Sequence, residues 1–130
     1  MSKTNPVVHF EMPYEDAKRV ADFYNKAFAW KMNLTNEAMG NYVTAQTTET
    51  SDNNRSTTPG AINGGFFQKS DSMPAQYPSV VISVDDIQNA MKSVADAGGK
   101  VLGEPMDIPG VGKYVSFMDS EGNRVSLLEV

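Results

Sequence analysis

The residue best suited to chemistry is His9, which lies two positions before Glu11 near the start of the sequence. An imidazole near neutral pH can both donate and accept a hydrogen bond, and both side chains can ligate a metal ion. The sequence has 130 residues with one histidine and no cysteine. These counts exclude thiolate metal sites, disulfides, cysteine nucleophiles and any site that needs two imidazoles from one chain.

The elements that position His9 follow an internal repeat with an offset of 70 residues. A short extended run at 7–12 has a counterpart at 77–84, and acidic residues and a helical pattern follow each run. The apolar positions of both helices fall at i, i+3, i+4, i+7 and i+10, which gives each helix one apolar stripe. Asp16 and Asp86 are candidates to cap the two helices at their N-termini.

Three short extended runs separated by turns follow each helix. They lie at 30–34, 42–48 and 61–68 in the first half and at 100–106, 113–118 and 123–130 in the second. Each half is therefore predicted to fold as βαβββ, within a single α+β domain over 1–130. Module one covers about 6–69, the linker about 70–76 and module two about 77–130. The polar segment 47–60 is expected to be an exposed loop that could act as a lid.

Side chains alternate between the two faces of a strand, and the more apolar set should face the helix. The helix-facing residues predicted in this way are Phe10, Met12, Val80, Ile82, Val84, Val125 and Leu127. The residues predicted on the opposite face are His9, Glu11, Ser79, Ser126 and Leu128. Polar side chains from both halves are therefore expected on the face that no helix covers.

This arrangement resembles the vicinal oxygen chelate superfamily, which includes glyoxalase I, the bleomycin-resistance proteins and the extradiol dioxygenases. The segments that carry the resemblance are HFEMP at 9–13, FY at 23–24, FAWK at 28–31, PGAINGG at 59–65, VDDI at 84–87, AGGKV at 97–101, IPGVG at 108–112 and DSEGN at 119–123. The resemblance implies that two tandem βαβββ modules form a curved mixed-sheet cup, with the helices outside and the ligand inside. It also implies a homodimer.

The resemblance also implies where a metal would bind. Metal-dependent members hold one divalent ion with His, Gln or Glu from the first and fourth strands of each module. His9 matches one such position, but the others fall on Ser79, Ser126 and a glycine in 62–66, which are weak ligands or none. No metal cofactor is therefore predicted. A site built from His9, Glu11 and Glu129 remains an alternative, because one histidine with two carboxylates is a known ligand set.

Composition and charge exclude several other classes of protein. The sequence has 16 acidic against 11 basic residues and a net charge of −5, which disfavours nucleic acids and anionic membranes as partners. No apolar stretch is long enough to span a membrane, and residues 1–6 lack the apolar segment of a secretion signal, so a cytoplasmic location is expected. Neither a serine-hydrolase motif nor a phosphate-binding loop is present.

The leading prediction is a glyoxalase/bleomycin-resistance-like protein that binds a small organic molecule in its cup without a tightly held metal. The ligand-contacting residues predicted are His9, Glu11, Ser79, Ser126, Trp30 and Tyr114. Further candidates for an apolar wall are Phe66, Phe67, Tyr42, Met106 and Met118. One alternative is a divalent-metal-dependent lyase, isomerase or dioxygenase in which His9 is a ligand. The other is a non-catalytic interaction module in which His9 serves as a hydrogen-bonded structural residue.

Overall fold

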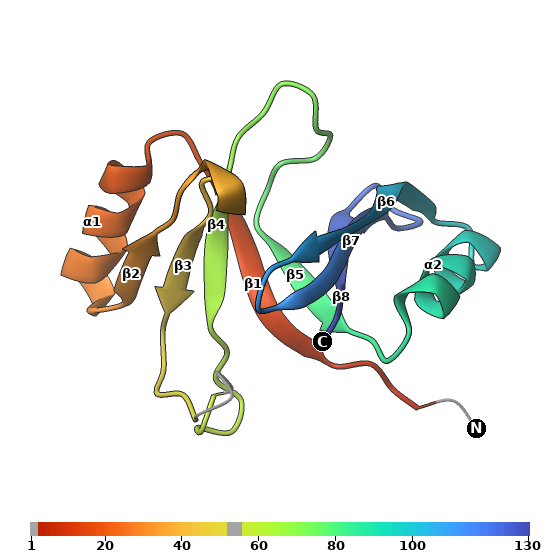
Figure 1. Cartoon of the computed structure of the whole chain (residues 1–130), viewed down its shortest axis with the longest axis horizontal. Helices are drawn as coiled ribbons and strands as arrows, with labels where there is room; N and C mark the ends of the chain where they lie inside the picture. The colour runs from red at the N-terminus through yellow and green to blue at the C-terminus, as the bar shows by residue number, and fades with distance from the viewer. Residues whose placement is uncertain (1–2, 52–55) are drawn as a thin grey trace. The chain divides into compact units, whose positions relative to one another are not determined.

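The computed structural model describes residues 3–51 and 56–130. They form two compact units, one from His9–Pro78 and the other from Ser79–Val130 together with the described residues up to Val8. Figure 1 shows one helix beside the strands of each unit.

The first unit contains one helix and a mixed sheet of four strands. Its elements are β1 (Val7–Tyr14, of which His9 onward belongs here), α1 (Ala17–Phe28), β2 (Lys31–Leu34), the 3-10 helix η1 (Glu37–Met39), β3 (Val43–Gln46) and β4 (Gly64–Gln68). The strands lie in the order β2-β3-β4-β1. β1 runs parallel to β4, and the other neighbouring pairs are antiparallel.

The second unit repeats this arrangement. Its elements are β5 (Ser79–Ser83), α2 (Ile87–Asp96), β6 (Lys100–Ile108), β7 (Gly112–Met118) and β8 (Arg124–Glu129), and its strands lie in the order β5-β8-β7-β6. β5 runs parallel to β8, and the remaining pairs are antiparallel. The predicted α+β class and the βαβββ order of both halves are therefore confirmed.

Both helices begin at the acidic residues that the sequence singled out. The Asp16 carboxylate accepts a hydrogen bond from the Arg19 amide, and the Asp86 carboxylate accepts one from the Asn89 amide, each at 3.0 Å. Each bond satisfies an amide that has no partner within its own helix. α1 ends at Phe28, and Ala29 adopts the left-handed conformation with φ 59°. The chain therefore reverses direction directly before Trp30.

Two strands of the first unit are shorter than predicted because a side chain replaces the sheet ladder. The runs at 42–48 and 61–68 become β3 (Val43–Gln46) and β4 (Gly64–Gln68). Asn63 Oδ1 accepts hydrogen bonds from the amides of Thr47 at 2.8 Å and Thr48 at 3.1 Å. These amides therefore bond to the side chain just before β4 and do not extend the pairing between β3 and β4.

The loop predicted at 47–60 lies between β3 and β4. Its first two residues are held by Asn63, and Thr50 and Ser56 form an isolated antiparallel bridge. Residues 52–55 lie outside the described part of the chain. The role of this loop as a lid therefore stays a prediction.

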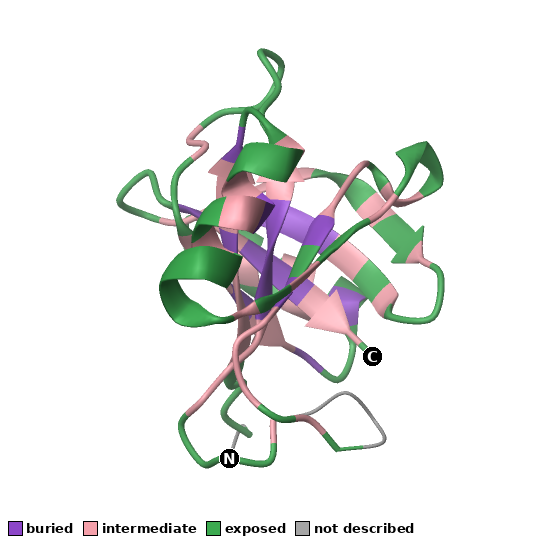
Figure 2. Cartoon of the chain, turned by 90° about the vertical axis from the view of Figure 1, so that its left-hand side faces the viewer, coloured by how far each residue is buried: buried purple, intermediate pink, exposed green. Residues whose placement is uncertain are grey.

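Each unit has an apolar core between its helix and its sheet. In the first unit the buried residues are Tyr14, Val43, Ala45 and Phe66, with Phe10, Met12, Val20, Tyr24 and Trp30 packed against them. In the second they are Val84, Ile87, Val115, Phe117 and Leu127, with Ile82, Val94 and Val125 packed against them. In the first unit, Figure 2 shows that burial is concentrated in the strands, whereas most of the outward side of α1 is exposed. The prediction that Phe10, Met12, Ile82, Val84, Val125 and Leu127 face the helices is confirmed.

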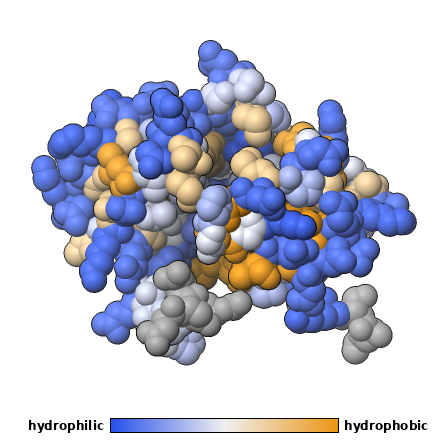
Figure 3. Space-filling model, in the orientation of Figure 1, coloured by the Kyte–Doolittle hydropathy of each residue, from blue (hydrophilic) through white to orange (hydrophobic). Residues whose placement is uncertain are grey.

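The outer surface is predominantly hydrophilic in the view of Figure 3. In α1, Ala17, Val20 and Tyr24 pack against the core, whereas Phe23 and Phe28 are more than half exposed. Within the described ranges 3–51 and 56–130, neither helix is long and apolar enough to cross a lipid bilayer.

Candidate functional site

His9 and Glu11 lie on the face of the first sheet that α1 does not cover. Their neighbours Phe10 and Met12 pack in the helix-side core, and alternation along β1 directs His9 and Glu11 to the opposite face. Glu11 is buried, with 4% of its surface exposed. A buried carboxylate requires hydrogen-bond partners, so the groups around Glu11 determine what this face can do.

The side chain of Tyr42 joins His9 to Glu11. Its hydroxyl donates a hydrogen bond to Glu11 Oε2 at 2.9 Å and lies 3.0 Å from His9 Nε2. The backbone carbonyl of Tyr42 accepts two hydrogen bonds from Thr35, one from the Thr35 amide at 3.2 Å and one from the Thr35 hydroxyl at 2.6 Å. These bonds fix the chain between η1 and β3, so the phenol is held in place from outside the strands.

Gly65 provides the space for the Tyr42 ring. Gly65 is the partner of Glu11 in the parallel β1–β4 ladder and of Thr44 in the antiparallel β3–β4 ladder. A Cβ atom built on Gly65 would overlap the ring and hydroxyl of Tyr42. The ring therefore lies directly on the backbone of β4, where any other residue type would project a side chain.

Burial controls the charge of the imidazole. Desolvation lowers the pKa of His9 from 6.5 to about 4, so the ring is neutral near pH 7. The ring lies nearly parallel to that of Tyr42, at an interplanar angle of 21° and a centroid separation of 6.5 Å. The site therefore offers a neutral imidazole, a phenol and a carboxylate, which is a hydrogen-bonding set of groups and not a cationic one.

The second unit gathers three hydroxyl groups on the face of its sheet opposite α2. Ser126 Oγ lies 2.7 Å from Tyr114 Oη and 3.0 Å from Ser116 Oγ. Ser116 and Ser126 are direct partners in the β7–β8 ladder, and Ser126 is 1% exposed. The structure thus brings together Ser126 and Tyr114, both predicted as ligand contacts.

Ser79 opens β5 and is half-buried. By alternation it shares a face with Val81, which pairs with Ser126 in the β5–β8 ladder. This is the side of the strand that the repeat predicted for Ser79, and its contact with a ligand stays a prediction.

Trp30 does not lie on the same face of the sheet as His9, although the sequence predicts that both contact the ligand. Its ring stacks on Tyr24 at 4.7 Å and 11°, and lies 5.7 Å from Phe10. Both neighbours belong to the helix-side core. Trp30 joins them because the left-handed turn at Ala29 returns the chain toward α1. We correct the prediction accordingly: Trp30 is a core residue on the opposite face from His9, and we leave it out of the site.

Sequence reasoning missed two residues of this geometry. The sequence predicts Tyr42 only as part of an apolar wall, because its contact with Glu11 depends on a glycine in another strand. Ser116 is absent from the predicted site, although alternation with Tyr114 along β7 and the pairing of β7 with β8 indicate it.

The donor groups do not fit the divalent ion that the family resemblance implies. Within residues 3–51 and 56–130, no three histidine, cysteine, aspartate or glutamate side chains are grouped so that they could hold a metal. The third ligand of the alternative site, Glu129, accepts the Ile87 amide at 2.9 Å at the start of α2. His9 Nε2 and Glu11 Oε2 both contact the Tyr42 hydroxyl. We therefore derive no chemical step through a metal.

The first unit also carries a surface pocket of about 500 Å³ next to the start of α1. Its lining includes Tyr14, Glu15, Arg19, Phe23 and Lys69. Tyr14 belongs to the helix-side core, and Lys69 lies 3.5 Å from Glu15 in an exposed ion pair. This pocket shares no residue with the His9, Tyr42 and Glu11 group, so we treat it as separate from the site.

Comparison with known proteins defines the class. The family model of the Glyoxalase/Bleomycin resistance protein/Dioxygenase superfamily matches residues 7–127, and the chain belongs to this family. Solved structures support the fold. One is methylmalonyl-CoA epimerase from Streptomyces coelicolor in complex with 2-nitronate-propionyl-CoA, with a TM-score of 0.68 at 16% sequence identity. The match covers 98% of this chain and 95% of the epimerase chain. Methylmalonyl-CoA epimerase from Mycobacterium tuberculosis has a TM-score of 0.67 at 13% identity, covering 99% of this chain and 92% of its own.

A curated relative is more similar in sequence. The anthracycline biosynthesis protein DnrV of Streptomyces peucetius is 30% identical over 122 residues, which cover 87% of this chain and 42% of DnrV. The chain therefore spans about two-fifths of the length of this relative.

Proposed function

We propose that this protein binds a small, planar aromatic molecule on the face that carries His9, Tyr42 and Glu11, without a tightly held divalent ion. The observation that carries the proposal is the position of the Tyr42 hydroxyl, which contacts both His9 Nε2 and Glu11 Oε2. A set of hydrogen-bonding groups that contains no cation and lies beside an aromatic ring is typical of sites for organic ligands that carry no negative charge.

The chemistry of the site favours an aromatic ligand. The His9 ring lies nearly parallel to the Tyr42 ring, at an interplanar angle of 21°. Flat rings of this kind suit stacking or edge contacts with a flat ligand. The name of DnrV associates it with anthracycline biosynthesis, and anthracyclines contain fused aromatic rings. We therefore choose an anthraquinone as the first probe.

The residues also favour binding without a metal. His9 and Glu11 supply two metal-ligating groups, and the phenol between them is a neutral donor. A divalent ion held by so few protein atoms would have to displace the Tyr42 proton from Glu11 and complete its coordination with solvent.

The test measures the Tm of the purified protein alone, in the presence of a dihydroxyanthraquinone, and in the presence of Zn²⁺, Ni²⁺, Mn²⁺ or Fe²⁺. A ligand at about 100 times its Kd stabilises the folded state by about 2.7 kcal/mol, which raises the Tm by several degrees. We expect such a shift with the anthraquinone, its loss in His9→Ala, and no shift with the ions.

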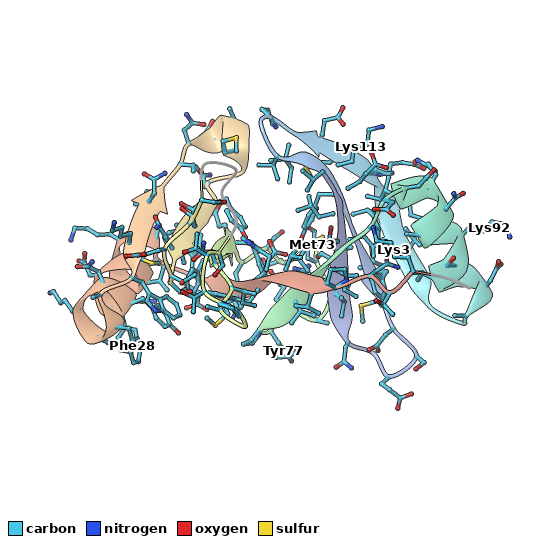
Figure 4. All side chains as sticks on the ribbon, turned by 90° about the horizontal axis from the view of Figure 1, so that it is seen from below. Lys3, Phe28, Met73, Tyr77, Lys92 and Lys113 are labelled. Carbon is cyan, nitrogen blue, oxygen red and sulfur yellow. The ribbon has the colours of Figure 1, made fainter. Side chains whose placement is uncertain are left out.

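Tyr77→Phe is the matched control, because Tyr77 is 71% exposed and projects away from the strands in Figure 4. It should keep the anthraquinone shift. A shift of several degrees with zinc or nickel that disappears in His9→Ala would instead support the metal-dependent lyase, isomerase or dioxygenase. No response to either set would support the interaction module.

Other parts of the predicted function rest on the sequence analysis and on the family resemblance. Ligand contacts from Ser79, Ser126 and Tyr114, a homodimer and a cytoplasmic location all stay predictions. The identity of the natural ligand is part of the same proposal.

A further inference from the structure

The protons of the His9, Tyr42 and Glu11 group can be placed from its hydrogen bonds. An ionised carboxylate only accepts, and a phenol has one proton. The Tyr42 hydroxyl donates that proton to Glu11 Oε2 at 2.9 Å. The 3.0 Å contact between Tyr42 Oη and His9 Nε2 then requires Nε2 to be the donor.

The other ring nitrogen of His9 is consequently an acceptor. A neutral imidazole carries its proton on one nitrogen only, so a protonated Nε2 leaves a lone pair on Nδ1. Burial lowers the pKa of His9 to about 4, which keeps the ring in this neutral form near pH 7. Tyr42 thus determines which of the two nitrogens can accept a bond from a ligand.

The lone pair of Nδ1 is within reach of a ligand. Across residues 3–51 and 56–130, every fully buried side-chain nitrogen or oxygen has a hydrogen-bond partner. The described interactions of His9 with polar groups use Nε2, toward Tyr42. Nδ1 therefore has access to solvent and can exchange a water molecule for a ligand atom.

The acceptor atoms of His9 and Glu11 determine which class of ligand this face disfavours. Nδ1 is an acceptor, and Glu11 adds a carboxylate on the same face of β1. A carboxylate or phosphate ligand would bring its own acceptor oxygens against the Nδ1 lone pair and the oxygens of Glu11, which is unfavourable in a partly desolvated site. A ligand with an O–H or N–H group would complete the chain of hydrogen bonds through His9 and Tyr42 to Glu11.

We propose that Tyr42 is a positioning residue that holds His9 in the Nε2–H tautomer, and that the ligand is an aromatic molecule that donates a hydroxyl or amine hydrogen to Nδ1. This inference deepens the proposed function and rests on it for the ligand. The tautomer itself is a property of the protein without ligand.

The first experiment measures the tautomer in the ligand-free protein by nitrogen-15 NMR of the imidazole. His9 is the single histidine, so the imidazole signals need no assignment to a residue, and only Nδ1 and Nε2 have to be told apart. We expect a protonated Nε2 and an unprotonated Nδ1 near pH 7 in the parent protein and in Tyr77→Phe. In Tyr42→Phe we expect the two tautomers to mix. A protonated Nδ1 in the parent, or an unchanged tautomer in Tyr42→Phe, overturns the role of Tyr42.

The second experiment compares a dihydroxyanthraquinone with its dimethyl ether and with an anthraquinone carboxylate by isothermal titration calorimetry. One lost hydrogen bond in a partly buried site weakens binding by about tenfold. We expect the ether and the carboxylate to bind at least that much more weakly to the parent protein and to Tyr77→Phe. In Tyr42→Phe, where about half of the imidazole would be in the competent tautomer, the preference for hydroxyl over ether should fall by about twofold.

The two experiments separate the two proposals. Equal binding of the hydroxyl compound and its ether by the parent protein overturns the ligand class while leaving the proposed function in place. If no anthraquinone binds, the proposed function and the ligand class both fail, whereas the NMR result still decides whether Tyr42 sets the tautomer of His9.

Discussion

The ring of Tyr42 lies directly on Gly65, the residue that pairs with Glu11 across the parallel β1–β4 ladder. The phenol of Tyr42, which precedes β3, can therefore reach the buried carboxylate of Glu11. A larger residue at position 65 of β4 would place its own side chain beside Glu11 instead. The absence of a Cβ atom at one position of β4 thus determines the hydrogen-bond partners of His9 and Glu11.

Adding one methyl group at Gly65 should therefore displace Tyr42. Gly65→Ala is expected to lower the free energy of unfolding by about 1–3 kcal/mol, because the added atom overlaps the ring and the backbone of β4 cannot withdraw from its ladders. Urea denaturation measures this loss. In a Tyr42→Ala background the same change should cost markedly less, and equal costs in both backgrounds would show that the ring is not what Gly65 accommodates.

Removing the hydroxyl of Tyr42 tests the hydrogen bonds without changing the packing. Tyr42→Phe should lower the free energy of unfolding by about 1–3 kcal/mol, because Glu11 is 4% exposed and loses a donor in a buried environment. Tyr77→Phe removes a hydroxyl from an exposed ring and should change stability by less than about 0.5 kcal/mol. Similar losses in the two variants would contradict a specific role for the buried phenol.

The sequence predicted the parts of this site that follow from local rules. Asp16 and Asp86 cap the helices, and alternation directs His9 and Glu11 away from Phe10 and Met12. These features depend on helix start signals and on the period of a strand, which can be read directly from the order of residues.

The residues that were missed or misplaced depend on conformations that the sequence pattern does not specify. Tyr42 reaches Glu11 only because Gly65 lies between them and because the preceding Asn41 adopts φ 55°. Trp30 lies beneath α1 because Ala29, an unusual residue for a left-handed position, reverses the chain there. Both outcomes involve non-glycine residues at positive φ, a conformation that residue type signals weakly at Asn41 and not at Ala29.

Glu129 should act as a helix cap and not as a metal ligand. Its carboxylate accepts the Ile87 amide at 2.9 Å at the N-terminus of α2, where a negative charge is favourable. Glu129→Ala is expected to cost about 0.5–2 kcal/mol in urea denaturation, and Glu121→Ala, at an exposed turn, much less. A variant that instead kept its stability but lost a Zn²⁺-induced rise in Tm would assign Glu129 to a metal site.

The buried imidazole should make stability depend on pH in a defined window. The pKa of His9 is about 4 in the folded protein, against 6.5 for a fully solvated histidine, so between these values the unfolded chain binds more protons. The contribution of His9 is therefore fully present above about pH 6.5 and is lost as the pH falls toward about 4.

This window can be isolated because no other histidine titrates in it. On lowering the pH from about 7 to about 5, we expect His9 to remove roughly 2 kcal/mol from the free energy of unfolding, since one pKa unit corresponds to about 1.4 kcal/mol. His9→Gln keeps a donor toward Tyr42 but does not titrate, so subtracting its pH dependence removes the contribution of the carboxylates. If the parent protein and His9→Gln lose the same stability over this range, His9 is not buried as a neutral ring, and the acceptor role of Nδ1 loses its basis.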